Sequence, residues 1–252
     1  MTLVDVHCHL DYYDSFEVNE IIKRAKDVRI VTNSTDFRSC ELNLEIARNH
    51  SNVYLACGMY PPDVLEIEKS KKYSWNFEEV RDFILRNKAE IVAIGETGID
   101  FSEYKDKDKQ IELFKKFLEL ACKINKPIII HSRKAEKEVI EIIKNYECKK
   151  IMHCFSGNFK LINQAIEQEC FFSIPTNIVR SEHFQKMSQI LPEDKILTET
   201  DSPFLSPFKE KRNEPAFVVE GLKKIAELKK ISIEECQTLI YKNFKTLFKF
   251  IN

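Results

Sequence analysis

Short apolar runs alternate with longer amphipathic segments along the whole chain. Eight runs have the composition of buried strands: Leu3 to Val6, Val28 to Thr32, Val53 to Cys57, Ile91 to Ile94, Ile128 to Ile130, Lys150 to Met152, Cys170 to Ile174 and Ile196 to Thr198. Helical periodicity marks the segments Ile21 to Val28, Phe77 to Asn87, Gln110 to Ile124, Val139 to Tyr146, Leu161 to Gln168 and Phe184 to Leu191. The pattern therefore predicts that strands and helices alternate.

Repeated strand–helix units in a chain of 252 residues predict a (β/α)8 barrel, an α/β fold of the TIM type. We expect a single domain over residues 1–252. A doubly wound open sheet is the alternative, because it uses the same alternation of elements. Two more helices are predicted after the last strand, at Pro215 to Lys230 and Ser232 to Phe250, and we expect them to brace the barrel. Ser232 and Glu235 have capping-box spacing at the start of the second.

The first predicted strand finishes in two histidines, in the segment Val4-Asp5-Val6-His7-Cys8-His9. Successive residues of a strand point to opposite faces, so His7 and His9 share one face and Cys8 lies on the other. This arrangement suits chelation of one metal ion. The alternative is a pair of hydrogen-bonded histidines with a structural role.

Further candidate ligands follow other predicted strands: Glu96 in IVAIGE, His131 in PIIIHS, His153 in KIMHCFSG and Asp201 in ILTETDSP. In a barrel these strand ends meet at one mouth, the face on which such enzymes carry their catalytic groups. Four of the six histidines of the chain belong to this set. Carboxylates and imidazoles gathered there would be poorly satisfied without cations between them, so we predict a divalent-metal site.

Composition is that of a soluble globular protein, with 43% hydrophobic and 31% charged residues. The first residues, MTLVDVHCHLDYYD, contain no basic leader, and no window approaches the ~20 apolar residues that cross a bilayer. We therefore expect a cytoplasmic protein that has no membrane partner. No obligate protein partner is inferred.

The chain has eight cysteines and no CxxC pair, which favours reduced thiols and argues against a zinc ribbon. A net charge of −1 argues against extensive electrostatic wrapping of nucleic acid. It does not exclude a nucleic-acid substrate, because metal ions can supply the positive charge that phosphates need.

Several motifs, in order, resemble the TatD family of metal-dependent deoxyribonucleases, within the wider group of amidohydrolase-like barrels. They are VDVHCHLD, AIGETGID, KPIIIHSRKA, MHCFSG, TETDSPFLSP, KRNEPAFV and NFKTLF, and they extend through the whole length of the chain. The resemblance implies metal ligation by the same residues that strand-end position selects: His7, His9, Glu96, His131, His153 and Asp201.

Two divalent ions, Mg, Mn or Zn, are the expected cofactors. Many relatives in the wider group bridge their metals with a carboxylated lysine on the fourth strand. This chain has Glu96 there, and we assign it as the bridge. One ion would take His7, His9 and Asp201, and the other His131 and His153. We also predict that Asp201 orients and deprotonates the attacking water.

Three residues are predicted to contact the substrate. Arg133 lies two positions beyond a ligand and has the geometry to pair with a phosphate, whereas a surface ion pair is the alternative. Arg212 lies on the loop after the last strand, over the same mouth. Tyr60 stands where many relatives carry the histidine of a GxHP motif, so it can donate a hydrogen bond or stack on a base but cannot act as a cation near neutral pH.

Three functions remain open at the level of sequence. The resemblance implies hydrolysis of DNA phosphodiesters from a single-stranded end, with DNA as the partner. A metal-activated water attacks carbonyl carbon as well, so hydrolysis of another ester or amide, such as an aminoacyl ester on tRNA, is the second. The third is a metal-binding protein that has lost catalysis, which the intact set of ligands argues against. Chromogenic phosphodiester, carboxyester and amide substrates would discriminate among them.

Overall fold

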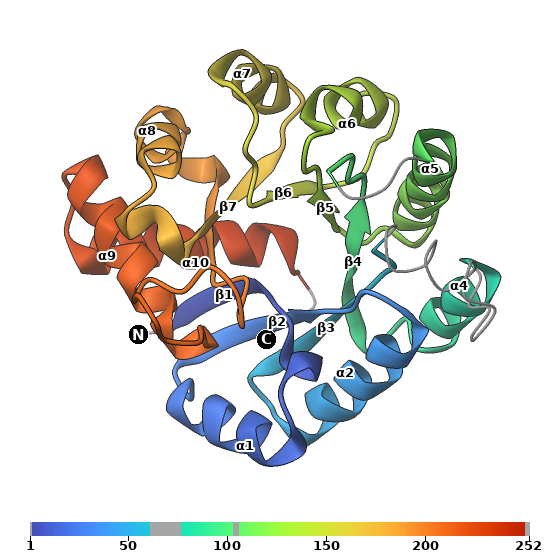
Figure 1. The fold of residues 1–252 in the computed structure, drawn as a ribbon, viewed down its shortest axis with the longest axis horizontal. Helices are drawn as coiled ribbons and strands as arrows, with labels where there is room; N and C mark the ends of the chain where they lie inside the picture. Colours follow the sequence, from blue (N-terminus) through green and yellow to red (C-terminus); the bar gives the residue numbers. More distant parts are fainter. Residues whose placement is uncertain (1, 61–76, 103–105, 250–252) are drawn as a thin grey trace.

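Eight parallel strands form the centre of the molecule, with helices around them (Figure 1). The computed structural model describes residues 2–60, 77–102 and 106–249. The strands pair in sequence order and are β1 (Leu3–Cys8), β2 (Val28–Asn33), β3 (Val53–Cys57), β4 (Ile91–Gly98), β5 (Ile128–His131), β6 (Lys150–His153), β7 (Phe171–Pro175) and β8 (Ile196–Glu199). This order confirms the TIM barrel and excludes the doubly wound sheet.

Polar side chains contribute hydrogen bonds at the seam between β1 and β8. Thr200 donates from its backbone N and its hydroxyl to the carboxylate of Asp5, at 2.9 and 2.6 Å. The hydroxyl of Thr198 donates to the carbonyl of Val4 at 2.5 Å. Asp5 is fully buried, so these donors satisfy a carboxylate that would otherwise be costly inside the barrel. The barrel is nearly closed as a result.

Helices follow most of the strands and cover the outside of the barrel. They are α1 (Ser15–Arg24), α2 (Phe37–Asn49), α4 (Phe77–Arg86), α5 (Lys107–Ile124), α6 (Glu136–Ile143), α7 (Phe159–Glu167), α8 (Glu182–Ile190), α9 (Val218–Lys229) and α10 (Ile233–Leu247). Short 3-10 turns lie at Leu10–Tyr12, Thr176–Val179, Glu193–Lys195 and Pro215–Phe217. The apolar faces of the helices and both faces of the strands form the core.

Helix α1 differs from the sequence prediction of Ile21 to Val28. It begins at Ser15, because Asp14 caps it: the Asp14 carboxylate accepts from the backbone N–H of Glu17, and the Glu17 carboxylate accepts from the backbone N–H of Asp14. It ends before β2 starts at Val28, so the predicted end of the helix was wrong. Helix α2, with an equivalent cap at Asp36, was not among the predicted segments.

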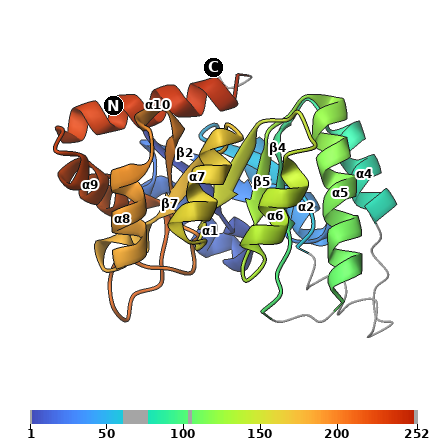
Figure 2. The ribbon, with the colours of Figure 1, turned by 90° about the horizontal axis from the view of Figure 1, so that it is seen from above.

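Helix α10 lies across one end of the barrel (Figure 2). Its Asn243 amide donates to the carbonyls of Glu193 and Ile196, at 2.7 and 2.8 Å, at the beginning of β8. The predicted capping box of Ser232 and Glu235 is present, whereas the predicted end at Phe250 lies outside the described residues. Since α10 covers the amino-terminal end of the strands, the opposite end is left for the mouth.

One pair of cysteines corrects the expectation of reduced thiols. Cys40 of α2 and Cys57 at the end of β3 form a disulfide, with Cα atoms 5.6 Å apart. The packing of α2 against β3 brings the two residues within bridging range, a proximity that their spacing in the sequence does not reveal. The other six cysteines are free.

No helix among the described residues is long and apolar enough to span a bilayer.

Candidate active site

Strand β1 and the residue after it place two imidazoles side by side. The Nε2 atoms of His7 and His9 are 3.2 Å apart, and both residues are buried. The ring of His9 is oriented by its Nδ1, which donates to the carbonyl of Asn33 at 3.1 Å and leaves Nε2 directed into the site. Cys8 points the other way, into the core between the barrel and α1. The alternation expected from the sequence therefore brings His7 and His9 together.

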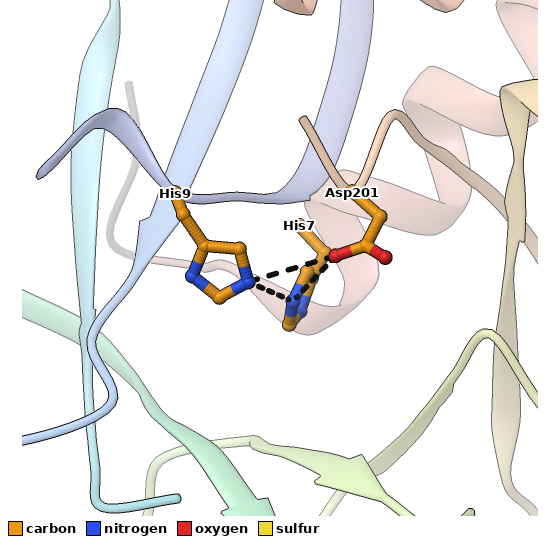
Figure 3. Close-up of side chains that lie close together, drawn as sticks. All are labelled: His7, His9 and Asp201. Carbon is orange, nitrogen blue, oxygen red and sulfur yellow. Dashed lines mark hydrogen bonds and ion pairs between the residues drawn. The ribbon is translucent and has the colours of Figure 1, made fainter. Parts of the chain in front are cut away.

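Asp201 meets this pair from the loop after β8 (Figure 3). Its backbone N donates to the carbonyl of His7 at 2.8 Å, which fixes the start of the loop against β1. Its Oδ1 lies 3.6 Å from the Nε2 of His7 and 3.5 Å from the Nε2 of His9. Two nitrogens and one carboxylate oxygen thus face a common point.

Glu96 stands between the two groups of histidines and directs one oxygen to each. Its Oε2 is 3.4 Å from the Nε2 atoms of both His7 and His9. Its Oε1 is 2.8 Å from Nδ1 of His131 and 3.9 Å from Nε2 of His153. The side chain is buried within β4, so its two oxygens have fixed and different surroundings.

Two carboxylates that the sequence analysis missed orient the second pair of histidines. Asp100 Oδ2 lies 2.9 Å from Nε2 of His131, and Glu199 Oε2 lies 2.9 Å from Nδ1 of His153. Each contact occupies the nitrogen that faces away from Glu96 and leaves the other nitrogen directed at the centre. Glu199 is the last residue of β8, and its position two residues before Asp201 was a signal in the sequence that could have identified it.

The donor atoms are spaced as ligands of a metal ion. Ligands at ~2.1 Å from a tetrahedral ion are about 3.4 Å from one another. The Nε2 atoms of His7 and His9 are 3.2 Å from each other and 3.4 to 3.6 Å from the nearest oxygens of Glu96 and Asp201. Three overlapping groups have metal-binding geometry: His7, His9 and Asp201; Glu96, His131 and His153; and His7, His153 and Glu199. The residues therefore fit divalent metal binding, with nitrogen and oxygen donors of the type that zinc and manganese accept.

The electrostatics of the site also favour cations. Burial alone would raise the pKa of Glu96, but the surrounding imidazoles of His7 and His131 hold it well below its usual value. Burial opposes charge on His9, yet the hydrogen bond with Asp201 and nearby carboxylates raise its pKa to about 9. The carboxylates thus favour protonation of His9 and of His131, whose pKa is also raised to about 9, whereas burial lowers the pKa of His7 to about 3. A metal ion would take the place of the protons on His9 and His131.

Comparison with known proteins identifies the family. Residues 4–249 match the family described as TatD related DNase. The chain belongs to the TatD family. This TatD chain is 38% identical over 250 residues to an uncharacterized metal-dependent hydrolase of Methanocaldococcus jannaschii, covering 98% of this chain and 96% of that one. It is 31% identical over 261 residues to the human protein named deoxyribonuclease TATDN3, covering 98% and 94%.

Solved structures agree with this assignment. The crystal structure of YJJV, a TatD homolog from Escherichia coli, has a TM-score of 0.86 and 25% identity to this chain, with 98% of each chain covered. A TatD family hydrolase from Entamoeba histolytica has the same TM-score at 20% identity and therefore shows the shared fold. The protein is a TatD-type metal-dependent hydrolase built on a TIM barrel.

The predicted substrate residues of the TatD chain have different surroundings. Arg133 is exposed on the loop after β5. Burial raises the pKa of the Cys154 thiol, and the positive charge of Arg133 opposes that rise. Arg133 therefore lies near Cys154, the residue after His153. Tyr60 donates from its hydroxyl to Asp100 at 2.6 Å, and its ring meets the ring of His131 edge-on at 4.9 Å. The phenol thus joins the carboxylate that orients His131.

Arg212 lies further along the rim of the mouth. Its guanidinium donates to the carbonyl of Tyr12 at 2.6 Å and to Glu17 at 3.1 Å, and it covers the ring of Tyr13 at 4.1 Å. These contacts give Arg212 a bracing role in the segment after β1. Its side chain is nevertheless 47% exposed, so a substrate has access to it.

Proposed function

We propose that this TatD chain hydrolyses phosphodiester bonds of DNA. The observation that carries the proposal is Glu96, whose two oxygens face two different pairs of histidines at the mouth of the barrel. A carboxylate in that position suits a bridge between two cations, and paired cations suit displacement at phosphorus. The human relative named deoxyribonuclease supports DNA as the substrate.

Two divalent ions, Mg, Mn or Zn, are the proposed cofactors. The first would be held by His7, His9 and Asp201, and the second by His131 and His153, with Glu96 between them. When bound, such ions would lower the pKa of water and offset the charge of the phosphate. Asp100 and Glu199 keep the two imidazoles of the second group in the orientation that ligation requires.

Asp201 is the proposed general base. One of its oxygens faces His7 and His9, and its carboxylate is not placed between the two groups of histidines. It would take a proton from the attacking water as the water oxygen bonds to phosphorus. The bond from phosphorus to the 3′ or 5′ oxygen of the next nucleotide would break, and that oxygen would leave as a hydroxyl by taking up the proton from Asp201 or from solvent. Burial would raise the pKa of Asp201, but the hydrogen bond with His9 and the nearby imidazoles lower it, so the carboxylate is ionised and able to accept.

Three side chains at the rim of the barrel mouth are proposed to contact the substrate. Arg133 would pair with a phosphate next to the one that is cleaved, because a guanidinium binds phosphate in a bidentate manner. Arg212 and Tyr60 are the other proposed contacts. A net charge of −1 fits a site that holds a short single-stranded end better than one that wraps a duplex. We therefore favour exonucleolytic attack on single-stranded DNA.

The test is degradation of end-labelled single-stranded DNA by the purified chain, with Mg²⁺, Mn²⁺ or Zn²⁺ and with a chelator. We expect stepwise shortening that the chelator abolishes. A carboxyester, an amide and an aminoacyl ester are assayed in parallel with the same metals. Turnover of those substrates without cleavage of any phosphodiester would reject the proposal in favour of an ester or amide hydrolase, and inactivity on all of them would favour a non-catalytic protein.

A further inference from the structure

We infer that Tyr12 and Phe204 form a stacking site for an unpaired nucleobase at the rim of the metal centre. The inference rests on the proposed function and adds a subsite to it. Both aromatic side chains are exposed, at 41% for Tyr12 and 51% for Phe204. Each follows a residue of the site by three positions, Tyr12 after His9 and Phe204 after Asp201.

The two exposed rings pack in one aromatic cluster with the buried ring of His9. The ring of Tyr12 lies nearly parallel to that of His9, at 21° and 5.2 Å between centroids. Phe204 meets Tyr12 edge-on at 5.8 Å and 89°, and its ring centroid is 6.5 Å from that of His9. A flat group can therefore pack on one ring and touch the edge of the other while its attached phosphate reaches the site.

Hydrogen bonds hold the backbone of the loop that carries Phe204. Its backbone N donates to the carbonyl of Asp201 at 2.8 Å, and its carbonyl accepts from the buried amide of Asn213 at 2.6 Å. The next carbonyl, that of Leu205, accepts from Thr176 at 3.0 Å. A backbone held on both sides of an exposed ring presents that ring in one place, and such preorganisation reduces the entropy lost on binding.

Tyr12 is held in a comparable way. Its carbonyl accepts from Arg212 at 2.6 Å, and the neighbouring Tyr13 donates from its hydroxyl to the carbonyl of Asn213 at 2.5 Å. Asn213 thereby links the segment after β1 to the loop after β8. The two exposed rings consequently have a fixed relation to each other.

The chemistry of the surface selects a nucleobase among the parts of a DNA strand. Phosphates and sugars gain little from an aromatic face, whereas every base has a π surface that stacks on Tyr or Phe without regard to sequence. A base in a duplex is already stacked on its neighbours, so the surface favours an unpaired one. The site would hold the base beside the cleaved phosphate and help to select single-stranded ends.

The test compares binding of two probes to the metal-loaded chain by fluorescence anisotropy. One is a cleavage-resistant phosphorothioate oligothymidylate; the other has the same backbone, with abasic sugars in place of the two terminal nucleosides at each end. We expect the wild type to bind the first about 5- to 150-fold more tightly, which is the usual range for stacking of one base. The double variant Tyr12→Ala and Phe204→Ala should bring the ratio close to one.

Phe159→Leu is the matched control, because Phe159 is 42% exposed on α7 and is not part of this surface. It should keep the wild-type ratio. Circular dichroism and metal content verify that the double variant is folded. If the wild type cleaves DNA but binds both probes with equal affinity, the stacking site is rejected and the proposed function is kept. This outcome does not depend on the folding of any variant. Failure of the wild type to cleave any phosphodiester would instead reject the proposed function.

Discussion

Asp201 has two candidate roles at the scale of single residues, ligand and base. Its replacement in Asp201→Asn keeps the shape and one oxygen donor but removes the basic carboxylate. If Asp201 accepts the proton, kcat on a DNA oligonucleotide should fall by about 10² to 10⁴-fold. Arg133→Ala is the contrasting variant, with a higher KM and a smaller loss of kcat. Near-normal turnover of fully metal-loaded Asp201→Asn would leave the residue as a ligand only.

Glu96 contacts both groups of histidines, so its loss should affect both proposed ions. Glu96→Ala is expected to bind fewer than two ions per chain at metal concentrations that saturate the wild type, because each ion loses one oxygen ligand. Metal analysis of the purified variant after dialysis measures the ratio. Retention of two ions with unchanged affinity would show that Glu96 is not the bridge.

The buried carboxylates behind the histidines should control metal affinity without touching the metal. Asp100→Asn and Glu199→Gln remove the charge that orients His131 and His153, and each should weaken metal binding by about 10- to 100-fold. Isothermal titration with Zn²⁺ or Mn²⁺ measures the change. Asp14→Asn is the control, because Asn caps a helix as well as Asp does and this N-cap residue of α1 is exposed. Wild-type affinity in both site variants would contradict the orienting role.

Some residues of the site could be predicted from the sequence and others could not. His7 and His9 could be placed together because strand periodicity is local, and the other ligands could be added because barrel strands end at one mouth. Asp100 was missed because many carboxylates follow strands, and the three-dimensional register shows which of them meets an imidazole. The position of Glu199 at the end of β8 made it a candidate, but its contact with His153 depends on how β6 and β8 are placed in the barrel. Tyr60 was expected to face the substrate, and its bond to Asp100 depends on the same register.

At the scale of elements, β4 and β5 must approach closely for His131 to face Glu96. Gly98 makes this possible, with φ of +153°, and a Cβ there would strike the backbone of His131. Gly98→Ala should lower the free energy of unfolding by more than ~2 kcal/mol and weaken metal binding. Gly221→Ala is the control, since its Cβ would meet Thr176 at an ordinary 3.5 Å inside α9. Urea denaturation of both variants measures the difference, and equal stability would disprove the constraint.

Helix boundaries show where pattern alone fails at this scale. The apolar residues of α1 begin after an exposed Phe16, so periodicity placed its start too late, whereas the cap at Asp14 fixes the true start. Helix α2 is polar over most of its length and carries a weak apolar stripe. Strand β3 matched its predicted limits because a strand that is buried over most of its length has a continuous apolar sequence.

The whole molecule brings together the proposed ligands, which are far apart in the chain. They come from β1, β4, β5, β6 and the loop after β8, so an ion in the site would connect strands on opposite sides of the barrel. Hydrogen bonds join Asp5 of β1 to Thr200 just after β8, next to residues of the site. Closure of the barrel and assembly of the site are therefore coupled.

This coupling predicts that metal stabilises the folded chain. A ligand present at 100 times its Kd adds about 2.7 kcal/mol, and for a chain of this size that shifts Tm by roughly 5 to 11 °C. Thermal unfolding is followed by circular dichroism with saturating Mn²⁺ or Zn²⁺ and again after removal of metal by a chelator and dialysis. Glu96→Ala should show a smaller shift in the same metal, because it is expected to hold fewer ions. Metal analysis must confirm that ions were bound and then removed. An unchanged Tm of the wild-type protein would then mean that metal binds the folded chain no more tightly than the unfolded chain, which would contradict the coupling.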